Sequence, residues 1–416
     1  MPMSANRERS LEELERAMRR TPAYAEWRPL DPGPGADVDE RYAALPVTTS
    51  TWMGALSPRG FVPEGCDLDA ALDRDEHVEL VRTSGTTGPP MTLVWSQLWW
   101  DESERRSWSL NSAVSRIATG SHREAVLASP RCVGPGGEDG PLPLAERTLE
   151  NLLFVNERPN VTWDDAEVVR MRDELWQFAP EVVEADPAYL AAFCARAEAL
   201  GLALPRPAVV VLTYARPSRL HTARIERVMG AHVVSSYGST ETGYVLVSCE
   251  HGRLHQHLAS CRIDLLPWRD GARVKRLLVT PFGHPFMCVL RFDVGDLAKL
   301  ADGPCPCGRT EGYQFERIEG RVSDTTLRAD GVPLTLAELD DAVASCPSSD
   351  RIVSYQVEQT APGALRLRAV ATGAIDEGEI RRRLERLYGP GASVEVQSAP
   401  VLEPEPSGKY ATVRRR

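Results

Sequence analysis

The sequence has no long hydrophobic segment, no excess of positive charge and no repeated or low-complexity stretch. No apolar run approaches the roughly 18 residues that a membrane-spanning helix needs. A net charge of -11 argues against a general binder of nucleic acid or of anionic membranes. The first twenty residues are charged throughout and lack the apolar centre of a secretory signal. We therefore expect a cytoplasmic protein whose partners are neither nucleic acids nor membranes.

Cysteine is too sparse for a fold that depends on disulfide bonds, since nine cysteines are spread over 416 residues. Five of them are scattered, and we expect buried small apolar residues or ordinary surface thiols at Cys66, Cys132, Cys194, Cys261 and Cys288. Cys346 stands alone in the loop-like segment SCPSS. Cys249, Cys305 and Cys307 differ because histidine or a second cysteine lies close by in the sequence.

The chain is long enough for two or three domains. Its clearest pattern is a buried-strand run at 207–214, a helix at 218–230 ending in glycine, and a second strand at 231–238. Such alternation indicates parallel strands joined by a crossover helix. The sequence predicts an α/β protein, with a large N-terminal domain of mostly parallel sheets over 1–320 and a small, mobile α+β domain over 321–416.

A glycine- and hydroxyl-rich segment, VRTSGTTGPPM, occupies residues 81–91. Gly85 and Gly88 let the backbone turn tightly and approach a polyanion closely. Ser84, Thr86 and Thr87 add hydroxyl donors beside the backbone N–H groups. Taken alone, the segment is compatible with a phosphate-binding loop and equally with a polar turn between a strand and a helix.

A second polar segment, SSYGSTETG, covers residues 235–243 and follows the predicted strand at 231–238. Ligands of parallel sheets bind beyond the carboxyl ends of the strands. Glu241 offers oxygen ligands to Mg2+, Thr240 offers a hydroxyl to phosphate, and Tyr237 offers a flat face to a base. Two other interpretations stay open, because Tyr237 could belong to the core and Glu241 could start a helix.

Five segments in order resemble the core motifs of adenylate-forming enzymes, a superfamily that includes acyl- and aryl-CoA ligases, nonribosomal adenylation domains and luciferases. They are SGTTG, YGSTETG, RFDVGD at 291–296, the G-R pair at 320–321 and SGK at 407–409. The resemblance spans residues 81–410. The short chain and the segments RFDVGDLAKL, CPCGRTEG and IEGR are most similar to phenylacetate-CoA ligase-like enzymes.

The resemblance implies a role for each matching residue. The loop that handles the phosphates of ATP would be Ser84, Gly85, Thr86, Thr87 and Gly88. Around the nucleotide, Tyr237 would lie against adenine, Thr240 would contact phosphate and Glu241 would bind Mg2+, with Gly238 and Ser239 also counted as nucleotide-binding. Asp296 would hold the ribose hydroxyls, with Arg321 assisting nearby. Lys409 would be the mobile catalytic lysine of the small domain, although its position beside RRR also fits a solvated tail.

Three positions depart from the superfamily pattern. Pro89 stands where lysine is often found, so one phosphate-binding charge is missing. Ser323, followed by Asp324, stands where many members have aspartate at the hinge. The segment TYAR at 213–216 replaces a small-small-acidic sequence, which puts adenine contacts there in doubt.

The segments CEHGRLHQH at 249–257 and CPC at 305–307 suggest two halves of a zinc site. Thiolate and imidazole ligands in a tetrahedral array suit Zn2+. Cys249, Cys305 and Cys307 would supply sulfur, and His255 is favoured as fourth ligand over His251 and then His257. Some phenylacetate-CoA ligase-like proteins carry comparable cysteine clusters. The alternative is reduced cysteines in a turn, with His255 and His257 on an exposed strand. We expect a structural metal.

The resemblance implies a ligase that activates a small carboxylic acid with ATP and Mg2+ and transfers the acyl group to a thiol, most simply that of coenzyme A. An aromatic or compact apolar acid is expected from the similarity to the phenylacetate group. Two alternatives stay open: transfer to a carrier-protein thiol or an amine, and a non-catalytic relative that only binds nucleotide or acid. A homodimer is compatible with the sequence.

Overall fold

The computed structural model describes residues 3–83, 91–118, 121–134, 142–269 and 272–415. The chain forms two compact units, each assembled from two stretches of sequence. Unit 1 comprises residues 1–115 and 236–317, and unit 2 comprises residues 116–235 and 318–416. The predicted division into domains at 1–320 and 321–416 stays a prediction.

Unit 1 begins with short helices that pack on one another. They are α1 (Met3–Arg20), α2 (Val38–Ala44), α3 (Ser50–Leu56) and α4 (Leu68–Arg74), with 3-10 turns at Pro22–Leu30 and Arg59–Phe61. Their apolar faces meet in a core that includes Leu14, Tyr42, Met53 and Phe61 and extends to Phe292 at the start of β13. An antiparallel hairpin and a helix follow: β1 (Val78–Arg82), β2 (Thr92–Ser96) and α5 (Gln97–Trp108).

The sheet of unit 1 runs in the order β11-β12-β13-β14-β10-β9-β8. Its strands are β8 (His232–Ser239), β9 (Gly243–Ser248), β10 (Leu254–Gln256), β11 (Cys261–Pro267), β12 (Val274–Pro281), β13 (Phe292–Leu300) and β14 (Gln314–Arg321). The pairs β11–β12, β12–β13, β14–β10, β10–β9 and β9–β8 are antiparallel. The chain crosses from one unit to the other at three places, within α6 (Ser112–Ala118), within β8 and within β14. For this reason only the last residues of β8, from Ser236 on, belong to unit 1.

Unit 2 contains the parallel strands that the sequence pattern predicts. They run β8-β7-β6-β3-β5 with the antiparallel β4 beside β5. Their bounds are β3 (Glu124–Leu127), β4 (Thr148–Leu149), β5 (Leu152–Phe154), β6 (Val182–Ala185) and β7 (Val209–Leu212), with a 3-10 turn at Leu144–Glu146. Every residue of β6 and β7 is buried, as expected of parallel strands covered on both faces.

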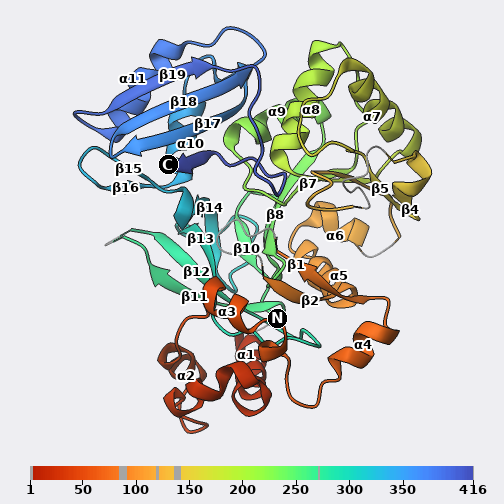
Figure 1. The fold of residues 1–416 in the computed structure, drawn as a ribbon, viewed down its shortest axis with the longest axis vertical. Coiled ribbons are helices and arrows are strands. Elements are labelled where there is room, and N and C mark those ends of the chain that lie inside the picture. Colours follow the sequence, from red (N-terminus) through yellow and green to blue (C-terminus); the bar gives the residue numbers. More distant parts are fainter. Residues whose placement is uncertain (1–2, 84–90, 119–120, 135–141, 270–271, 416) are drawn as a thin grey trace. The chain divides into compact units, whose positions relative to one another are not determined.

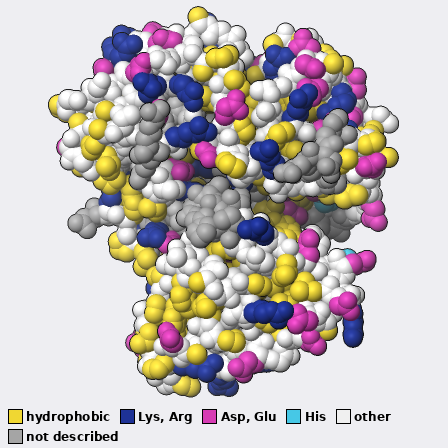
Figure 2. All heavy atoms as spheres, viewed as in Figure 1, with side chains coloured by type: hydrophobic (Ala, Val, Ile, Leu, Met, Phe, Trp, Pro, Cys, Tyr) yellow, Lys and Arg dark blue, Asp and Glu magenta, His cyan; other side chains and the backbone are white. Residues whose placement is uncertain are grey.

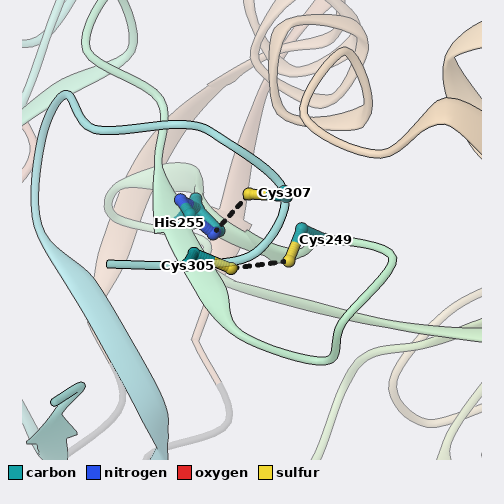
Figure 3. A group of neighbouring side chains, drawn as sticks. All are labelled: Cys249, His255, Cys305 and Cys307. Atoms are coloured by element: carbon teal, nitrogen blue, oxygen red, sulfur yellow. Dashed lines mark hydrogen bonds between the residues drawn. The ribbon is translucent and has the colours of Figure 1, made fainter. Parts of the chain in front are cut away.

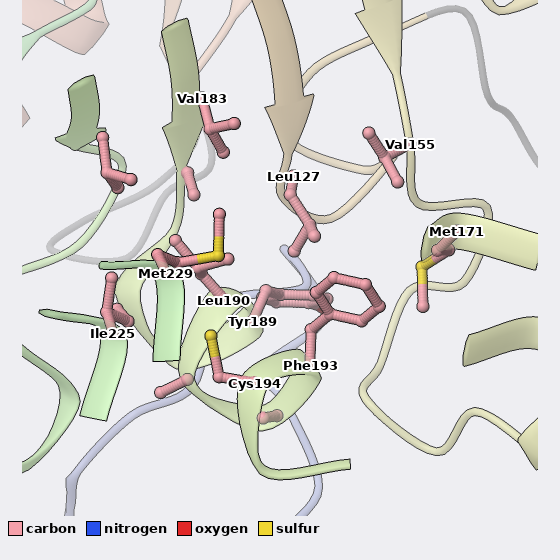
Figure 4. Packing of buried hydrophobic residues seen from close by; sticks show 14 of the residues in the cluster. Leu127, Val155, Met171, Val183, Tyr189, Leu190, Phe193, Cys194, Ile225 and Met229 are labelled. Atoms are coloured by element: carbon pink, nitrogen blue, oxygen red, sulfur yellow. The ribbon is translucent and has the colours of Figure 1, made fainter. Parts of the chain in front are cut away.

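Three helices cover this parallel sheet, and each has a clear starting signal. They are α7 (Asp165–Phe178), α8 (Pro187–Ala199) and α9 (Arg219–Met229). Asp164, Asp186 and Ser218 cap their first turns with side-chain oxygens, and α9 ends at Gly230 in the left-handed conformation. Figure 4 shows the resulting core, where Tyr189 and Phe193 of α8 lie opposite Leu127 of β3.

Residues 322–415 form a smaller α+β region with its own core. It contains β15 (Thr326–Leu327), β16 (Pro333–Leu334), α10 (Leu336–Ala344), β17 (Ile352–Ala361), β18 (Ala364–Ala371), α11 (Glu377–Tyr388), β19 (Ser393–Ser398) and β20 (Val413–Arg415), with 3-10 turns at Val322–Asp324 and Ser349–Arg351. Its sheet has the order β19-β18-β17-β20, and Leu339, Leu384 and Tyr388 pack against it (Figure 1). The expected α/β class with a smaller C-terminal α+β region is confirmed.

The cysteines and the hydrophobic segments can also be compared with the structure. All nine cysteines are free thiols, and no helix within the described ranges is both long and apolar enough to cross a membrane. On the face shown in Figure 2, acidic and basic side chains are interspersed rather than gathered into large fields of one sign.

Candidate active site and metal centre

The segment Ser239–Thr242 forms the turn of the hairpin between β8 and β9. The Thr242 amide donates to the carbonyl of Ser239 at 3.1 Å, and the two hydroxyls lie 3.0 Å apart. Thr240 and Glu241 therefore occupy the tip of a tight turn, and both are half-buried. The alternative in which Glu241 starts a helix is wrong, because β9 begins two residues later.

Two glycines allow this turn to close. A Cβ on Gly238 would lie 2.4 Å from the carbonyl oxygen of Gly243. Gly243 has a φ of +64°, and a Cβ there would lie 2.8 Å from Oγ of Ser103 in α5. Because both spaces are filled by backbone or by a neighbouring helix, side chains at these positions would displace the turn.

Tyr237 and Asp296 meet in unit 1, although 59 residues separate them. The phenolic hydroxyl of Tyr237, in β8, donates to Oδ2 of Asp296, in β13, at 2.8 Å. Asp296 follows Gly295, whose φ is +77° and whose amide donates to Oδ1 of Asp293 at 3.0 Å. Both predicted nucleotide contacts are half-buried. The alternative that Tyr237 is plain core does not explain a hydroxyl directed at a carboxylate.

Glu241 has chemistry suited to a metal ion. Its half-buried carboxylate forms no hydrogen bond or ion pair with another residue in the part of the chain that the structure describes. An available carboxylate beside the Thr240 hydroxyl fits the oxygen ligands that Mg2+ prefers. The predicted phosphate loop, Ser84, Gly85, Thr86, Thr87 and Gly88, lies outside the described residues, as does Pro89.

Lys409 lies in an anchored loop of unit 2. Its amide donates to Oγ of Ser407 at 3.4 Å, and its carbonyl accepts from the amide of Glu405 at 2.7 Å. Gly408 has a φ of +82° and packs so closely on Ser129 that a Cβ would lie 2.0 Å from the Ser129 hydroxyl. The interpretation of Lys409 as part of a solvated tail does not match a half-buried residue in a loop held on both sides.

Arg321 also belongs to unit 2, at the end of β14, and is half-buried. The glycine before it, Gly320, has a φ of +106°, and a Cβ there would lie 2.6 Å from Cβ of Leu336. At the hinge position, the Ser323 hydroxyl donates to Asp324 at 3.2 Å. Arg321 and Lys409 thus belong to unit 2, whereas Tyr237, Thr240, Glu241 and Asp296 belong to unit 1.

The segment at 213–216 forms buried polar contacts that its sequence does not indicate. The Tyr214 hydroxyl bonds to the buried carboxylate of Glu184. Arg216 forms a buried ion pair with Asp340 of α10, and its Nε donates to the carbonyl of Ile318 at 2.9 Å. Asp186, directly after β6, was also missed. The signal that could have found it is its position at the carboxyl end of a parallel strand.

Cys249, His255, Cys305 and Cys307 come together in unit 1. Their potential ligand atoms all lie within 4.8 Å of one another, and Figure 3 shows the four side chains directed toward a common centre. Cys249 follows β9 and His255 lies in β10, while both CPC cysteines lie in the loop between β13 and β14. Of the three candidate histidines, the structure places His255 in the group. His257 instead has Nδ1 3.1 Å from the Ser260 hydroxyl.

The spacing within this group fits a tetrahedral zinc ion. Zn–S bonds of about 2.3 Å and Zn–N bonds of about 2.0–2.1 Å place two sulfurs about 3.8 Å apart, and sulfur and nitrogen about 3.6 Å apart. The sulfurs of Cys249 and Cys305 are 3.6 Å apart, and Sγ of Cys307 is 3.5 Å from Nε2 of His255. The His251 amide donates to the Cys249 sulfur at 3.4 Å, an outer-shell contact typical of metal sites.

No protein-family model matches the chain, and no curated protein matches it. Solved structures do match. A 2-hydroxyisobutyryl-CoA ligase in the postadenylation state is 17% identical, covering 99% of this chain and 89% of that one, with a TM-score of 0.73. An anthranilate-CoA ligase in complex with anthranoyl-AMP is 12% identical, covering 79% and 64%, with a TM-score of 0.54.

An amide bond synthetase from Marinactinospora thermotolerans is 14% identical, covering 81% of this chain and 68% of that one, with a TM-score of 0.50. These identities are low, and the likeness lies in the arrangement of strands and helices. The 2-hydroxyisobutyryl-CoA ligase shares it over nearly the whole chain. The polypeptide described above therefore has the fold of the adenylate-forming CoA ligases.

Proposed function

We propose that this chain activates a carboxylic acid with ATP to an acyl-adenylate and then transfers the acyl group to the thiol of coenzyme A. The observation that carries the proposal is the Tyr237–Asp296 hydrogen bond beside the Thr240–Glu241 turn. It joins two of the five motif segments at one place in a chain with the fold of CoA ligases.

Two half-reactions make up the proposed cycle. An oxygen of the substrate carboxylate attacks the α-phosphorus of ATP, the bond to the β-phosphate breaks, and pyrophosphate leaves. The thiol then attacks the acyl carbon, loses its proton, and AMP leaves with the electrons of the broken C–O bond. Adenylation is needed because a carboxylate is a poor electrophile, whereas AMP is a good leaving group.

The proposed roles follow the positions of the residues. Asp296 would accept the ribose hydroxyls, Tyr237 with Gly238 and Ser239 would lie near adenine, and Thr240 would donate to phosphate. Mg2+, held by Glu241, would neutralise phosphate charge. Arg321 would assist near the ribose, and Ser84, Gly85, Thr86, Thr87 and Gly88 would cradle the phosphates. Lys409 would stabilise the charge that develops at the α-phosphate during attack.

The acid is proposed to be aromatic or otherwise compact and apolar, as the resemblance to phenylacetate-CoA ligase-like enzymes implies. An aromatic group in unit 1 supports this choice. The ring centroids of Trp95 and Trp100 are 4.4 Å apart, and those of Trp100 and Tyr244 are 4.9 Å apart. Tyr244 directly follows Gly243, so this group adjoins the Thr240–Glu241 turn. Trp95 and Trp100 are half-buried, whereas Tyr244 and Trp108 are buried, with 3% and 1% of each residue exposed.

A second acceptor class has one observation in its favour. The similarity to an amide bond synthetase supports an amine as an alternative to a thiol, and a carrier-protein thiol remains a third choice. Parallel assays that offer coenzyme A, a phosphopantetheinylated carrier protein and simple amines to the enzyme-bound adenylate would distinguish them. Only the true acceptor should release AMP at a rate that increases with its concentration.

We also propose that Cys249, His255, Cys305 and Cys307 hold a structural Zn2+. Four protein ligands would leave no open coordination position, which is the arrangement of structural zinc sites. The ion would join the turn after β9 to the loop between β13 and β14. These two strands also lead to the Thr240–Glu241 turn and to Asp296. The metal would therefore stabilise the framework of the nucleotide site without taking part in the chemistry.

ATP–pyrophosphate exchange with a broad panel of acids tests the proposed activity. We expect exchange with at least one aromatic or compact apolar acid, dependent on Mg2+. A complete lack of exchange across the panel, with folded protein that still binds nucleotide, would support the non-catalytic alternative.

A further inference from the structure

Asp186 is a buried carboxylate that the proposed function has not used. It directly follows β6 and caps α8, where Oδ1 accepts from the Ala188 amide at 2.8 Å. Only 2% of the residue is exposed, and it forms no ion pair with a residue that the structure describes. Burial raises the pKa of Asp186 to about 6, against the opposing effects of the Ala188 and Tyr189 amides and the charge of Lys409.

The loop that carries Lys409 is seated on the first turn of α8. The Tyr189 hydroxyl lies 2.8 Å from the Gly408 carbonyl and 2.7 Å from that of Pro159. The Cys132 thiol donates to the carbonyl of Ser407 at 3.0 Å. The Tyr410 hydroxyl accepts from the Val161 amide at 3.0 Å. Contacts thus hold residues 407, 408 and 410, and the charge of Lys409, which lies between them in the chain, lowers the pKa of Asp186.

A cap alone does not explain an aspartate at this position. Asparagine and serine cap helices as well as aspartate does, and neither places a charge in the interior. A buried charge without a contacting partner lowers stability. Groups held in such unfavourable surroundings are enriched at functional sites, where stability is lost in favour of activity. The Gly408 carbonyl, next to Lys409 in the chain, is bonded to Tyr189 in the first turn of the helix that Asp186 caps. The charge of Lys409 lowers the pKa of Asp186.

We propose that Asp186 is a positioning residue whose negative charge holds the Lys409 ammonium in place for the adenylation half-reaction. The inference rests on the proposed function, in which Lys409 stabilises charge at the α-phosphate. Asp186 would not touch substrate. It would act through Lys409, while Tyr189 and Ser129 fix the backbone of the loop.

The surroundings of Asp186 predict a simple dependence on pH. The titratable groups that act on it or are acted on by it are Lys409, Cys132, Tyr189 and Tyr410. Burial raises the pKa of Cys132 to about 11 and that of Tyr410 to about 12, and it raises the pKa of Tyr189 further. These three groups stay neutral between pH 5 and 8, so Asp186 is the group that changes charge there. Adenylation should therefore increase as the pH rises through about 6.

The test compares wild type with Asp186→Asn, which keeps a capping oxygen but removes the charge. The control is Asp164→Asn, the exposed cap of α7, whose carboxylate accepts from the Glu167 amide at 2.8 Å. We expect Asp186→Asn to lower pyrophosphate exchange by at least tenfold at pH 7.5, to lose the rise near pH 6, and to spare thiol transfer from supplied acyl-adenylate. Its melting temperature should equal or exceed that of wild type. Asp164→Asn should leave exchange unchanged.

Two results would overturn the inference. The first is an unchanged rate of pyrophosphate exchange in Asp186→Asn. The second is a proportional loss of both half-reactions together with a lower melting temperature, as expected if Asp186 serves only as a structural cap. If wild type shows no pyrophosphate exchange, the proposed function itself is wrong. In that case, hydrogen exchange of the segment 403–412 decides the inference. Faster exchange in Asp186→Asn than in wild type and Asp164→Asn supports it, and equal protection in all three contradicts it.

Discussion

The Tyr237 hydroxyl donates to the Asp296 carboxylate at 2.8 Å, which links the motif at the end of β8 to the motif in β13. An aspartate that is to bind two ribose hydroxyls has to present its oxygens in a fixed orientation. The phenol supplies one fixed hydrogen bond to Oδ2, so Tyr237 can orient Asp296 in addition to any contact of its ring with adenine.

Tyr237→Phe removes this hydrogen bond and keeps the ring. A neutral hydrogen bond contributes about 0.5–1.5 kcal/mol, and one to a charged group about 1.5–3. Because Asp296 is a carboxylate, we expect the KM for ATP to increase by roughly 10- to 150-fold, with a smaller change in kcat. Pyrophosphate exchange at varied ATP concentration measures both parameters. Tyr313→Phe, a change at a tyrosine outside the motifs, is the matched control and should leave both unchanged. An unaltered KM in Tyr237→Phe would remove the orienting role.

Lys409→Ala separates the two half-reactions. Removal of a group that stabilises transition-state charge costs about 10²- to 10³-fold in rate, so adenylation should fall by this amount. Transfer of the acyl group from supplied acyl-adenylate to coenzyme A should be spared. The control is Lys275→Ala in β12, a half-buried lysine outside the motif segments. Equal losses in both half-reactions would contradict the role assigned to Lys409.

Cys305→Ser tests the metal centre. The variant should hold less zinc by elemental analysis and melt at a lower temperature, because the bound ion stabilises the folded state. Cys66→Ser, which changes a half-buried thiol away from the cluster, should retain both zinc and stability. His255→Ala should behave like Cys305→Ser, and His257→Ala like the control. Full zinc content in Cys305→Ser would exclude Cys305 as a ligand. Treatment of wild type with a chelator should increase hydrogen exchange mainly at 245–310.

Asp186 gives the stability of the protein a defined dependence on pH. Its pKa is raised from 3.8 to about 6 in the folded state and is about 3.9 when unfolded. Between these values the folded protein binds a proton that the unfolded chain releases, so this contribution to stability falls as pH rises from about 4 to about 6. Asp186→Asn should remove it, leaving the variant more stable than wild type by at most about 3 kcal/mol at pH 7. Urea unfolding of both proteins at pH 4.5 and 7 measures the difference, and a gap that does not widen with pH would contradict the assignment.

Much of the parallel part of the fold follows from the sequence, because the alternation at 207–238 leaves few other arrangements. The structure has β7, α9 and β8 there, with α9 ending at Gly230. The antiparallel pairing in unit 1 was not foreseen, since apolar runs such as the one in β12 show burial but not strand direction. The expected mobility of residues 321–416 and the phosphate loop at 84–88 stay predictions.

Site residues could be predicted where several of them stand together in one sequence motif. A residue that stands alone in the sequence, such as Asp186, could not be predicted. Cys249, Cys305 and Cys307 were visible from their neighbours. The choice of His255 was not fixed by the sequence, because β10 ends at Gln256 and His257, beyond it, bonds to Ser260 instead. Asp186 gives two weak signals, a helix start before Pro187 and a position after a short apolar strand. Its buried charge depends on packing by segments as distant as 407–410, which no local pattern indicates.

The β9 strand connects the Thr240–Glu241 turn at one end with Cys249 at the other. Six residues of strand span about 20 Å, so the sulfur cluster is remote from the Thr240–Glu241 turn yet joined to it by one stiff segment. Protein purified from zinc-poor culture would accordingly show weaker apparent nucleotide affinity, with turnover at saturating ATP little changed. Batch-to-batch scatter in such measurements would then track metal loading.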